Sequence, residues 1–101
     1  MFTKIAAKPD LPAENEAKEF PCGSKVVCIA NVNGKISAID NVCLHNGGPL
    51  GAGTVVGGKV VCPWHGWMWD PNTGEAAHAP AAKVAVYPLK IDGEDVLVEM
   101  D

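Results

Sequence analysis

Two short pairs of cysteine and histidine are the residues of this 101-residue chain that point most directly to chemistry. Cys43-Leu-His45 is followed, after sixteen residues, by Cys62-Pro-Trp-His65. Each pair places a thiolate and an imidazole close together on one loop, so that two such loops supply two sulfur and two nitrogen ligands. The spacing therefore predicts a metal site that is closed by two loops.

The order of these ligands favours one kind of metal site over another. Zinc fingers with this ligand set usually have a pair of cysteines followed by a pair of histidines, whereas each loop here carries one of each. The alternation suits a two-metal cluster better, because both cysteines can bind one metal while both histidines bind the other. A structural zinc module is the alternative.

The motif and its neighbours resemble those of the Rieske proteins, in whose [2Fe–2S] cluster two histidines replace two cysteines on one iron. The runs HNGGPLG and CPWHGW are similar to those of Rieske ferredoxins and related oxygenase domains. The resemblance implies one [2Fe–2S] cluster as cofactor. It also implies that Cys43 and Cys62 bind one iron and that His45 and His65 bind the other.

Short strands separated by turns make up the rest of the chain, and no segment has the pattern of a long amphipathic helix. Asn33-Gly34 and Asp92-Gly93 are hairpin signals, and residues 83–91 are expected to form one long strand. We predict an all-β fold. The resemblance implies a Rieske-type antiparallel β-sandwich base with a small inserted cluster-binding β subdomain.

Composition changes in the middle of the chain and suggests where that insertion lies. Residues 41–69 contain no aspartate or glutamate, and Lys59 is their only lysine or arginine. A chain of this length is expected to form one domain. We therefore predict a single Rieske domain over residues 1–101, with a base formed by 1–40 and 76–101 and a cluster-binding subdomain over 41–75.

The surroundings of the predicted cluster are uncharged. The resemblance implies that the histidine edges face solvent or a partner, and their neighbours include Leu44, Pro49, Leu50 and Trp64. An exposed apolar surface of this kind marks a docking site. The alternative is that these side chains only shield the cluster from water.

Two departures from the respiratory members of the family bear on the reduction potential. Those members carry an additional cysteine in each loop, forming a disulfide, where this chain has Gly48 and Trp64. They also carry serine and tyrosine hydroxyls, which hydrogen-bond to sulfur, where this chain has Trp67 and Trp69. Hydrogen bonds to sulfur stabilise the reduced cluster, so their absence predicts a potential near the low end of the Rieske range, roughly −150 mV. The three tryptophans are expected to cover the cluster or fill the core of the subdomain.

Other candidate residues lie outside the motif. Cys22 and Cys28 are interpreted as buried thiols, with a disulfide across the intervening turn as the alternative. His78 is expected to be exposed. The family commonly has a proline-containing loop over the cluster, and residues 79–81 are a candidate for it.

A soluble one-electron carrier is the function that these observations predict. By the resemblance it passes electrons from a flavoprotein reductase to a terminal oxygenase and is not an enzyme alone, so no catalytic residue is assigned. The small Rieske subunit of an assimilatory nitrite reductase is the alternative. A net charge of −4 argues against nucleic acid as a partner. With no secretory or membrane-spanning apolar run, we expect a cytoplasmic protein that docks transiently as a monomer.

Overall fold

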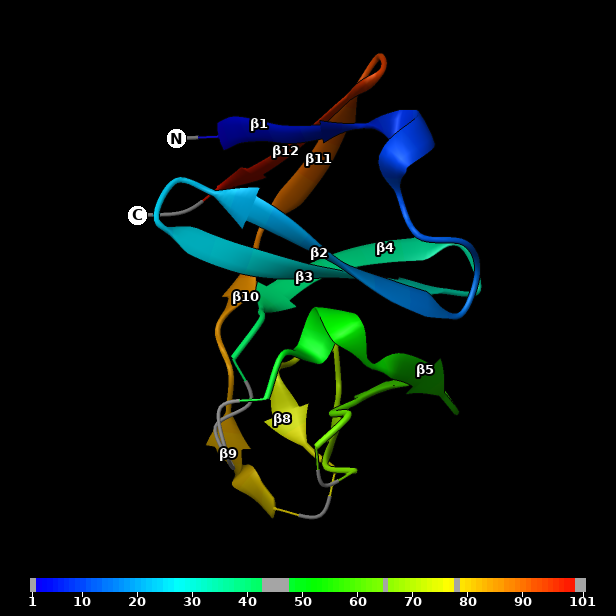
Figure 1. The fold of residues 1–101 in the computed structure, drawn as a ribbon, viewed down its shortest axis with the longest axis vertical. Coiled ribbons are helices and arrows are strands. Elements are labelled where there is room, and N and C mark those ends of the chain that lie inside the picture. The colour runs from blue at the N-terminus through cyan, green and yellow to red at the C-terminus, as the bar shows by residue number, and fades with distance from the viewer. Residues whose placement is uncertain (1, 43–47, 65, 78, 100–101) are drawn as a thin grey trace.

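The computed structural model describes residues 2–42, 48–64, 66–77 and 79–99 (Figure 1). Within these ranges the regular elements are antiparallel strands and two short 3-10 helices, η1 and η2. The predicted all-β fold class is therefore confirmed. None of the helices in these ranges is long and apolar enough to cross a membrane.

The first part of the chain forms hairpins. Its elements are β1 (Phe2–Ala7), η1 (Lys8–Asp10), β2 (Glu16–Cys22), β3 (Lys25–Val32) and β4 (Lys35–Asp40). Asn33 and Gly34 join β3 to β4 with φ angles of 52° and 92°. Positive φ at two consecutive residues is the geometry of a tight hairpin turn, so the predicted hairpin is confirmed.

The middle of the chain extends the same sheet in short steps. Its elements are η2 (Leu50–Ala52), β5 (Thr54–Val56), β6 (Lys59–Val61), β7 (Met68–Trp69), β8 (Glu75–Ala76) and β9 (Ala79–Lys83). The strand order in this larger sheet is β10-β4-β3-β2-β5-β6-β7-β8-β9 among the described residues. A single register pair, Glu16 with Thr54, joins β2 to β5.

The long strand predicted over residues 83–91 is wrong. The chain instead forms β10 (Val86–Tyr87) beside β4, and then β11 (Leu89–Asp92), which pairs with β12 (Asp95–Glu99) in a smaller sheet ordered β1-β12-β11. Val84 N–H donates to the Gly74 carbonyl at 2.9 Å, which ties the chain to a turn before it continues to β10. Pro88 has no N–H to donate, and it lies where the chain passes from one sheet to the other.

Two hydrophobic clusters share β3. On one face of β3, Val27 and Ile29 pack with residues of the smaller sheet, including Val98. On the other face, Cys28 and Ala30 pack with residues that follow β4. Figure 1 shows the smaller sheet at the top, β2 to β4 across the middle, and β8 and β9 at the bottom. Because successive side chains alternate in direction, β3 links the base of the molecule to the layer that carries the predicted ligands. The predicted division at residues 41–75 stays a prediction.

Candidate metal centre

Cys62 is the predicted ligand that the structure describes. It follows β6 directly and is 2% exposed. It belongs to the hydrophobic cluster that contains Cys28 and Ala30 of β3. The Cys62 N–H donates to the Trp67 carbonyl at 2.8 Å, and the Gly66 N–H donates to the Cys62 carbonyl at 3.0 Å. These two bonds close the turn of the second loop and fix the backbone from which the thiol projects.

The other three predicted ligands, Cys43, His45 and His65, lie outside the described residues, so their role stays a prediction. The residues that flank the first loop are described. Val42 and Pro49 lie side by side in an isolated antiparallel bridge. Elsewhere in the described ranges, no three His, Cys, Asp or Glu side chains gather closely enough to hold a metal ion.

The two loops meet at the sulfur of Cys62. A Cβ atom built on Gly48 would lie 2.6 Å from Cys62 Sγ and 3.1 Å from Trp64 Cγ. The first loop therefore approaches the thiol so closely that its backbone, without a side chain, lies against the sulfur. Such a bare backbone beside a buried thiol is suited to cluster binding, because backbone N–H groups can then come close to sulfur.

A buried tryptophan adds a second sign that the site suits sulfur. Trp69 is completely buried in the same cluster as Cys62. Its Nε1–H has no hydrogen-bond acceptor in the described part of the molecule. An unsatisfied buried donor costs about 1–3 kcal/mol. The sulfur of a bound cluster would be an acceptor for it, so the residues present fit a [2Fe–2S] group.

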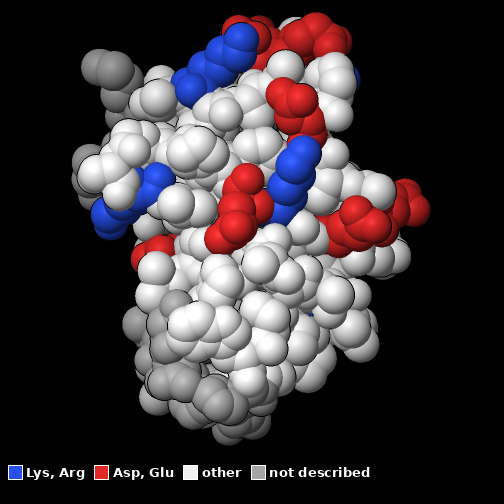
Figure 2. All heavy atoms as spheres, in the orientation of Figure 1, with Lys and Arg blue, Asp and Glu red and all other residues white. Residues whose placement is uncertain are grey.

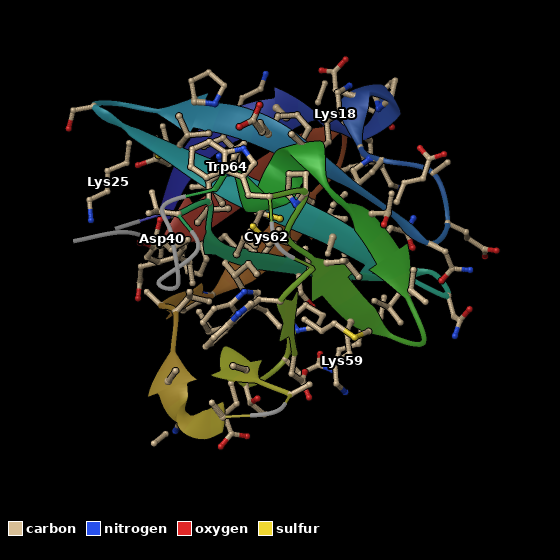
Figure 3. All side chains as sticks on the ribbon, turned by 60° about the horizontal axis from the view of Figure 1, so that its bottom comes forward. Lys18, Lys25, Asp40, Lys59, Cys62 and Trp64 are labelled. Carbon is tan, nitrogen blue, oxygen red and sulfur yellow. The ribbon has the colours of Figure 1, made fainter. Side chains whose placement is uncertain are left out.

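The tryptophans divide between core and surface. Trp69 is buried in the hydrophobic cluster that contains Cys62, and Trp67 packs against the same hydrophobic cluster. The ring centroids of Trp67 and Trp69 are 5.9 Å apart. Trp64, in contrast, is 56% exposed. In Figure 3 it lies beside Cys62, and the labelled Lys59 lies well away from both. The expectation of a core role therefore fits Trp69 and Trp67, whereas Trp64 belongs to the surface.

The predicted uncharged surface is seen on one face of the molecule, and its composition differs from the prediction. Figure 2 shows charged side chains over the upper part of this face and none on the described lower part of the same face, although Glu75 of β8 and Lys83 of β9 also belong to the lower end. Leu50 is fully buried, so its predicted place on that surface is wrong. It is the first residue of η2, which packs against β2 and β3. Val42, 52% exposed, joins Trp64 as an exposed apolar residue, Pro49 is half-buried, and Leu44 lies outside the described residues.

The remaining candidates are structural or lie outside the described ranges. Cys22 and Cys28 are both free, so the alternative of a disulfide between them is excluded. Cys22 is half-buried rather than buried, whereas burial and the Glu19 charge raise the pKa of Cys28 to about 12. His78 is outside the described residues. Residues 79–83, which include the predicted covering loop, form strand β9 paired with β8.

Replacing Gly48 by alanine is expected to weaken cluster binding more than it weakens the fold. In the absence of a cluster the Cys62 thiol can rotate away from the new methyl group. A sulfur held by iron cannot, so the clash at 2.6 Å acts on the loaded protein. We expect at least tenfold faster loss of visible absorbance in the presence of an iron chelator.

Gly23→Ala is the control for this change. Gly23 has a φ of +62° and no atom within 4 Å of an added Cβ, so alanine there costs backbone strain alone, about 1 kcal/mol. Equal rates of cluster loss in the two variants would show that the contact with Cys62 is not important.

The comparisons with known proteins agree with this geometry. The model of the Rieske [2Fe–2S] domain matches residues 1–88, and the chain belongs to this family. The family defines the cofactor as one [2Fe–2S] cluster.

Among the relatives, those of similar length to this chain are ferredoxin components of dioxygenase systems. The chain is 31% identical over 97 residues to the ferredoxin component of the naphthalene 1,2-dioxygenase/salicylate 5-hydroxylase systems of a Ralstonia species, covering 95% of this chain and 92% of the relative. It is 34% identical over 77 residues to the ferredoxin component of the Pseudomonas aeruginosa naphthalene 1,2-dioxygenase system, covering 75% and 74%. The Sphingomonas yanoikuyae B1 ferredoxin has the same fold, with a TM-score of 0.87 at 23% identity and complete coverage of both chains.

Proposed function

We propose that this protein is the one-electron carrier of a multicomponent oxygenase system and is not an enzyme on its own. It takes electrons from a flavoprotein reductase and passes them to a terminal oxygenase. The observation that carries the proposal is the match, over nearly the whole length of both chains, to a ferredoxin component of dioxygenase systems. No substrate-binding domain is needed for this role, because the bound cluster supplies the chemistry by gaining and losing one electron.

The residues of the chain hold the cluster at one end of the molecule. In this proposal Cys43 and Cys62 bind one iron, and His45 and His65 bind the other. Trp69 and Leu50, both fully buried, exclude water from the side of the protein core.

The terminal oxygenase is proposed to dock at the uncharged end. Trp64 and Val42 are more than half exposed there, and exposed apolar residues of this kind mark interaction sites. A solved structure with this fold, with a TM-score of 0.81 at 23% identity, is described as a complex of reduced oxygenase and oxidised ferredoxin in carbazole 1,9a-dioxygenase. In this proposal the apolar side chains have a function beyond shielding. We place the protein in the cytoplasm as a monomer between encounters.

A low reduction potential is part of the proposal, because Trp67 has no hydroxyl group to stabilise the reduced cluster, and Trp69 offers its Nε1–H in place of a hydroxyl. Trp67→Ser introduces a hydroxyl at a half-buried position. A hydrogen bond to a charged acceptor contributes about 1.5–3 kcal/mol. For one electron this corresponds to an increase of roughly 60–130 mV, which a redox titration followed by electron paramagnetic resonance measures.

Trp67→Ala is the matched control for that variant, since it removes the same indole ring without adding a hydroxyl. We expect the potential of Trp67→Ala to rise less than that of Trp67→Ser. The same potential in both variants would show that solvent access, and not hydrogen bonding, sets the potential.

The function is tested with the purified protein. We expect visible colour, two irons and two sulfides per chain, and a rhombic resonance signal after reduction with dithionite. Reconstitution with a flavoprotein reductase and candidate aromatic-ring oxygenases should then give product only when this protein is present. Two results would overturn the proposal: a colourless protein that holds one zinc ion, or stable co-purification with a nitrite reductase large subunit without transfer to any oxygenase.

A further inference from the structure

A buried asparagine closes the base of the first loop. Asn41 follows β4 directly and is 5% exposed. Its Oδ1 accepts a hydrogen bond from the Gly51 N–H at 2.6 Å, and its main-chain carbonyl accepts one from the Leu50 N–H at 2.7 Å. Asn41 and Gly51 thus hold together the two ends of the segment 42–50, which contains Cys43 and His45.

A glutamate from another strand holds this asparagine in place. Glu19 lies in β2, and its Oε2 accepts a hydrogen bond from Asn41 Nδ2 at 2.7 Å. A hydrogen bond to an ionised carboxylate is stronger than one to a neutral acceptor. Because Nδ2 and Oδ1 belong to one planar amide, fixing the first also orients the second toward Gly51.

Glu19 is an exposed residue of β2, but its side chain packs closely against the backbone of Gly51. A Cβ atom built on Gly51 would lie 2.5 Å from Glu19 Cγ and 2.8 Å from Glu19 N. Glu19 is also opposite Cys28 in the register of β2 and β3, and Cys28 belongs to the hydrophobic cluster that contains Cys62. The Glu19 side chain therefore lies on the face of β2 that is directed toward the predicted metal centre.

We propose that Glu19 is a positioning residue for the cluster: its carboxylate orients Asn41, and Asn41 in turn keeps the first ligand loop closed at its base. The proposal rests on the assignment of Cys43 and His45 as ligands. Glu19 is remote from them in sequence and belongs to a strand of the base. In this proposal the base of the ligand loop is consequently held by a residue outside the ligand motif.

Three variants of the full-length, cluster-loaded protein test this role. In Glu19→Ala the acceptor is lost, and we expect cluster loss to an iron chelator to become about tenfold faster. Glu19→Gln retains an oxygen acceptor and should stay within about threefold of the unmodified protein. Glu16→Ala is the control, because Glu16 belongs to the same strand but lies an odd number of residues away and so points to the opposite face. It should leave the rate unchanged.

A double-mutant cycle shows whether Glu19 acts through Asn41. Once Asn41 is replaced by alanine, Glu19→Ala should have no further effect on the rate of cluster loss. Additive effects, equal rates in Glu19→Ala and Glu16→Ala, or failure of Gln to rescue the rate would each overturn the proposal. Circular dichroism in the visible range adds a readout, since a displaced ligand loop alters the spectrum of the bound cluster.

Failure of the ligand assignment gives a different result. If Cys43→Ser retains a full cluster, the assignment on which the proposal rests is wrong. If Cys43→Ser loses the cluster while Glu19→Ala behaves like Glu16→Ala, the assignment holds and only the positioning role of Glu19 is rejected.

Discussion

Replacing Cys62 by serine is expected to remove the cluster and leave a colourless protein. The thiol is 2% exposed and lies where the two loops meet, with Gly48 against its sulfur. A serine hydroxyl at this position is a poor ligand, because it does not ionise readily and is a harder donor than thiolate. We expect iron and acid-labile sulfide to fall below about one tenth of the level in the unmodified protein, as measured chemically and by visible absorbance.

The other two cysteines outside the motif provide controls for that loss. Cys22→Ser changes a half-buried free thiol, and Cys28→Ala changes a buried one that stays protonated because burial raises its pKa to about 12. Both variants should retain the full cluster, although Cys28→Ala should lower the free energy of unfolding by about 1 kcal/mol. A full cluster in Cys62→Ser, or its loss in Cys22→Ser, would contradict the assignment.

Replacing Trp64 by glutamate is expected to slow electron transfer to the oxygenase by about 30-fold, the equivalent of the 2 kcal/mol that a tryptophan commonly contributes at the centre of an interface. Trp64 is 56% exposed, so the substitution does not disturb a packed core. A carboxylate in its place must lose its hydration when the partner docks, which costs free energy. Stopped-flow measurement of cluster oxidation by the oxygenase gives the rate, and an unchanged visible spectrum shows that the cluster is intact.

Val56→Glu is the matched control for docking. Val56 is 55% exposed, nearly the same as Trp64. Replacing it by glutamate introduces the same negative charge as Trp64→Glu. It is paired with Lys59 in the β5–β6 hairpin, and Figure 3 shows Lys59 well away from Trp64. A general effect of negative charge would slow transfer equally in both variants, whereas docking at the tip predicts slowing only in Trp64→Glu. A normal rate in Trp64→Glu would reject docking at this surface.

Local turn chemistry made much of the fold predictable. Asn33-Gly34 adopts the positive φ angles that this dipeptide favours, and strands lie on both sides of it as expected. The buried position of Cys62 also agrees with its interpretation as a ligand. In these cases the information lies in neighbouring residues, which is why a single sequence is sufficient.

The sequence does not show which strands pair when they are far apart along the chain. Residues 83–91 have the composition of one strand, yet β9, β10 and β11 pair with three different strands, and nothing local indicates where one partner is exchanged for the next. Leu50 stands between proline and glycine in an apparently exposed loop, and its burial depends on η2 packing against β2 and β3. The contact between Glu19 and Asn41 leaves no local signal in the sequence, because the two residues are 22 positions apart along the chain.

Strand β3 is buried on both of its faces, and this bears on how the cluster is inserted into the protein. One of its faces packs against Phe20, Ala38 and Val98, which belong to strands β2, β4 and β12 and not to the ligand loops. We therefore expect that half of the molecule to fold before any iron is bound. We expect the assembly machinery of the cell to deliver the cluster to a scaffold that is already folded at one end, so that maturation completes the other end and not the whole chain.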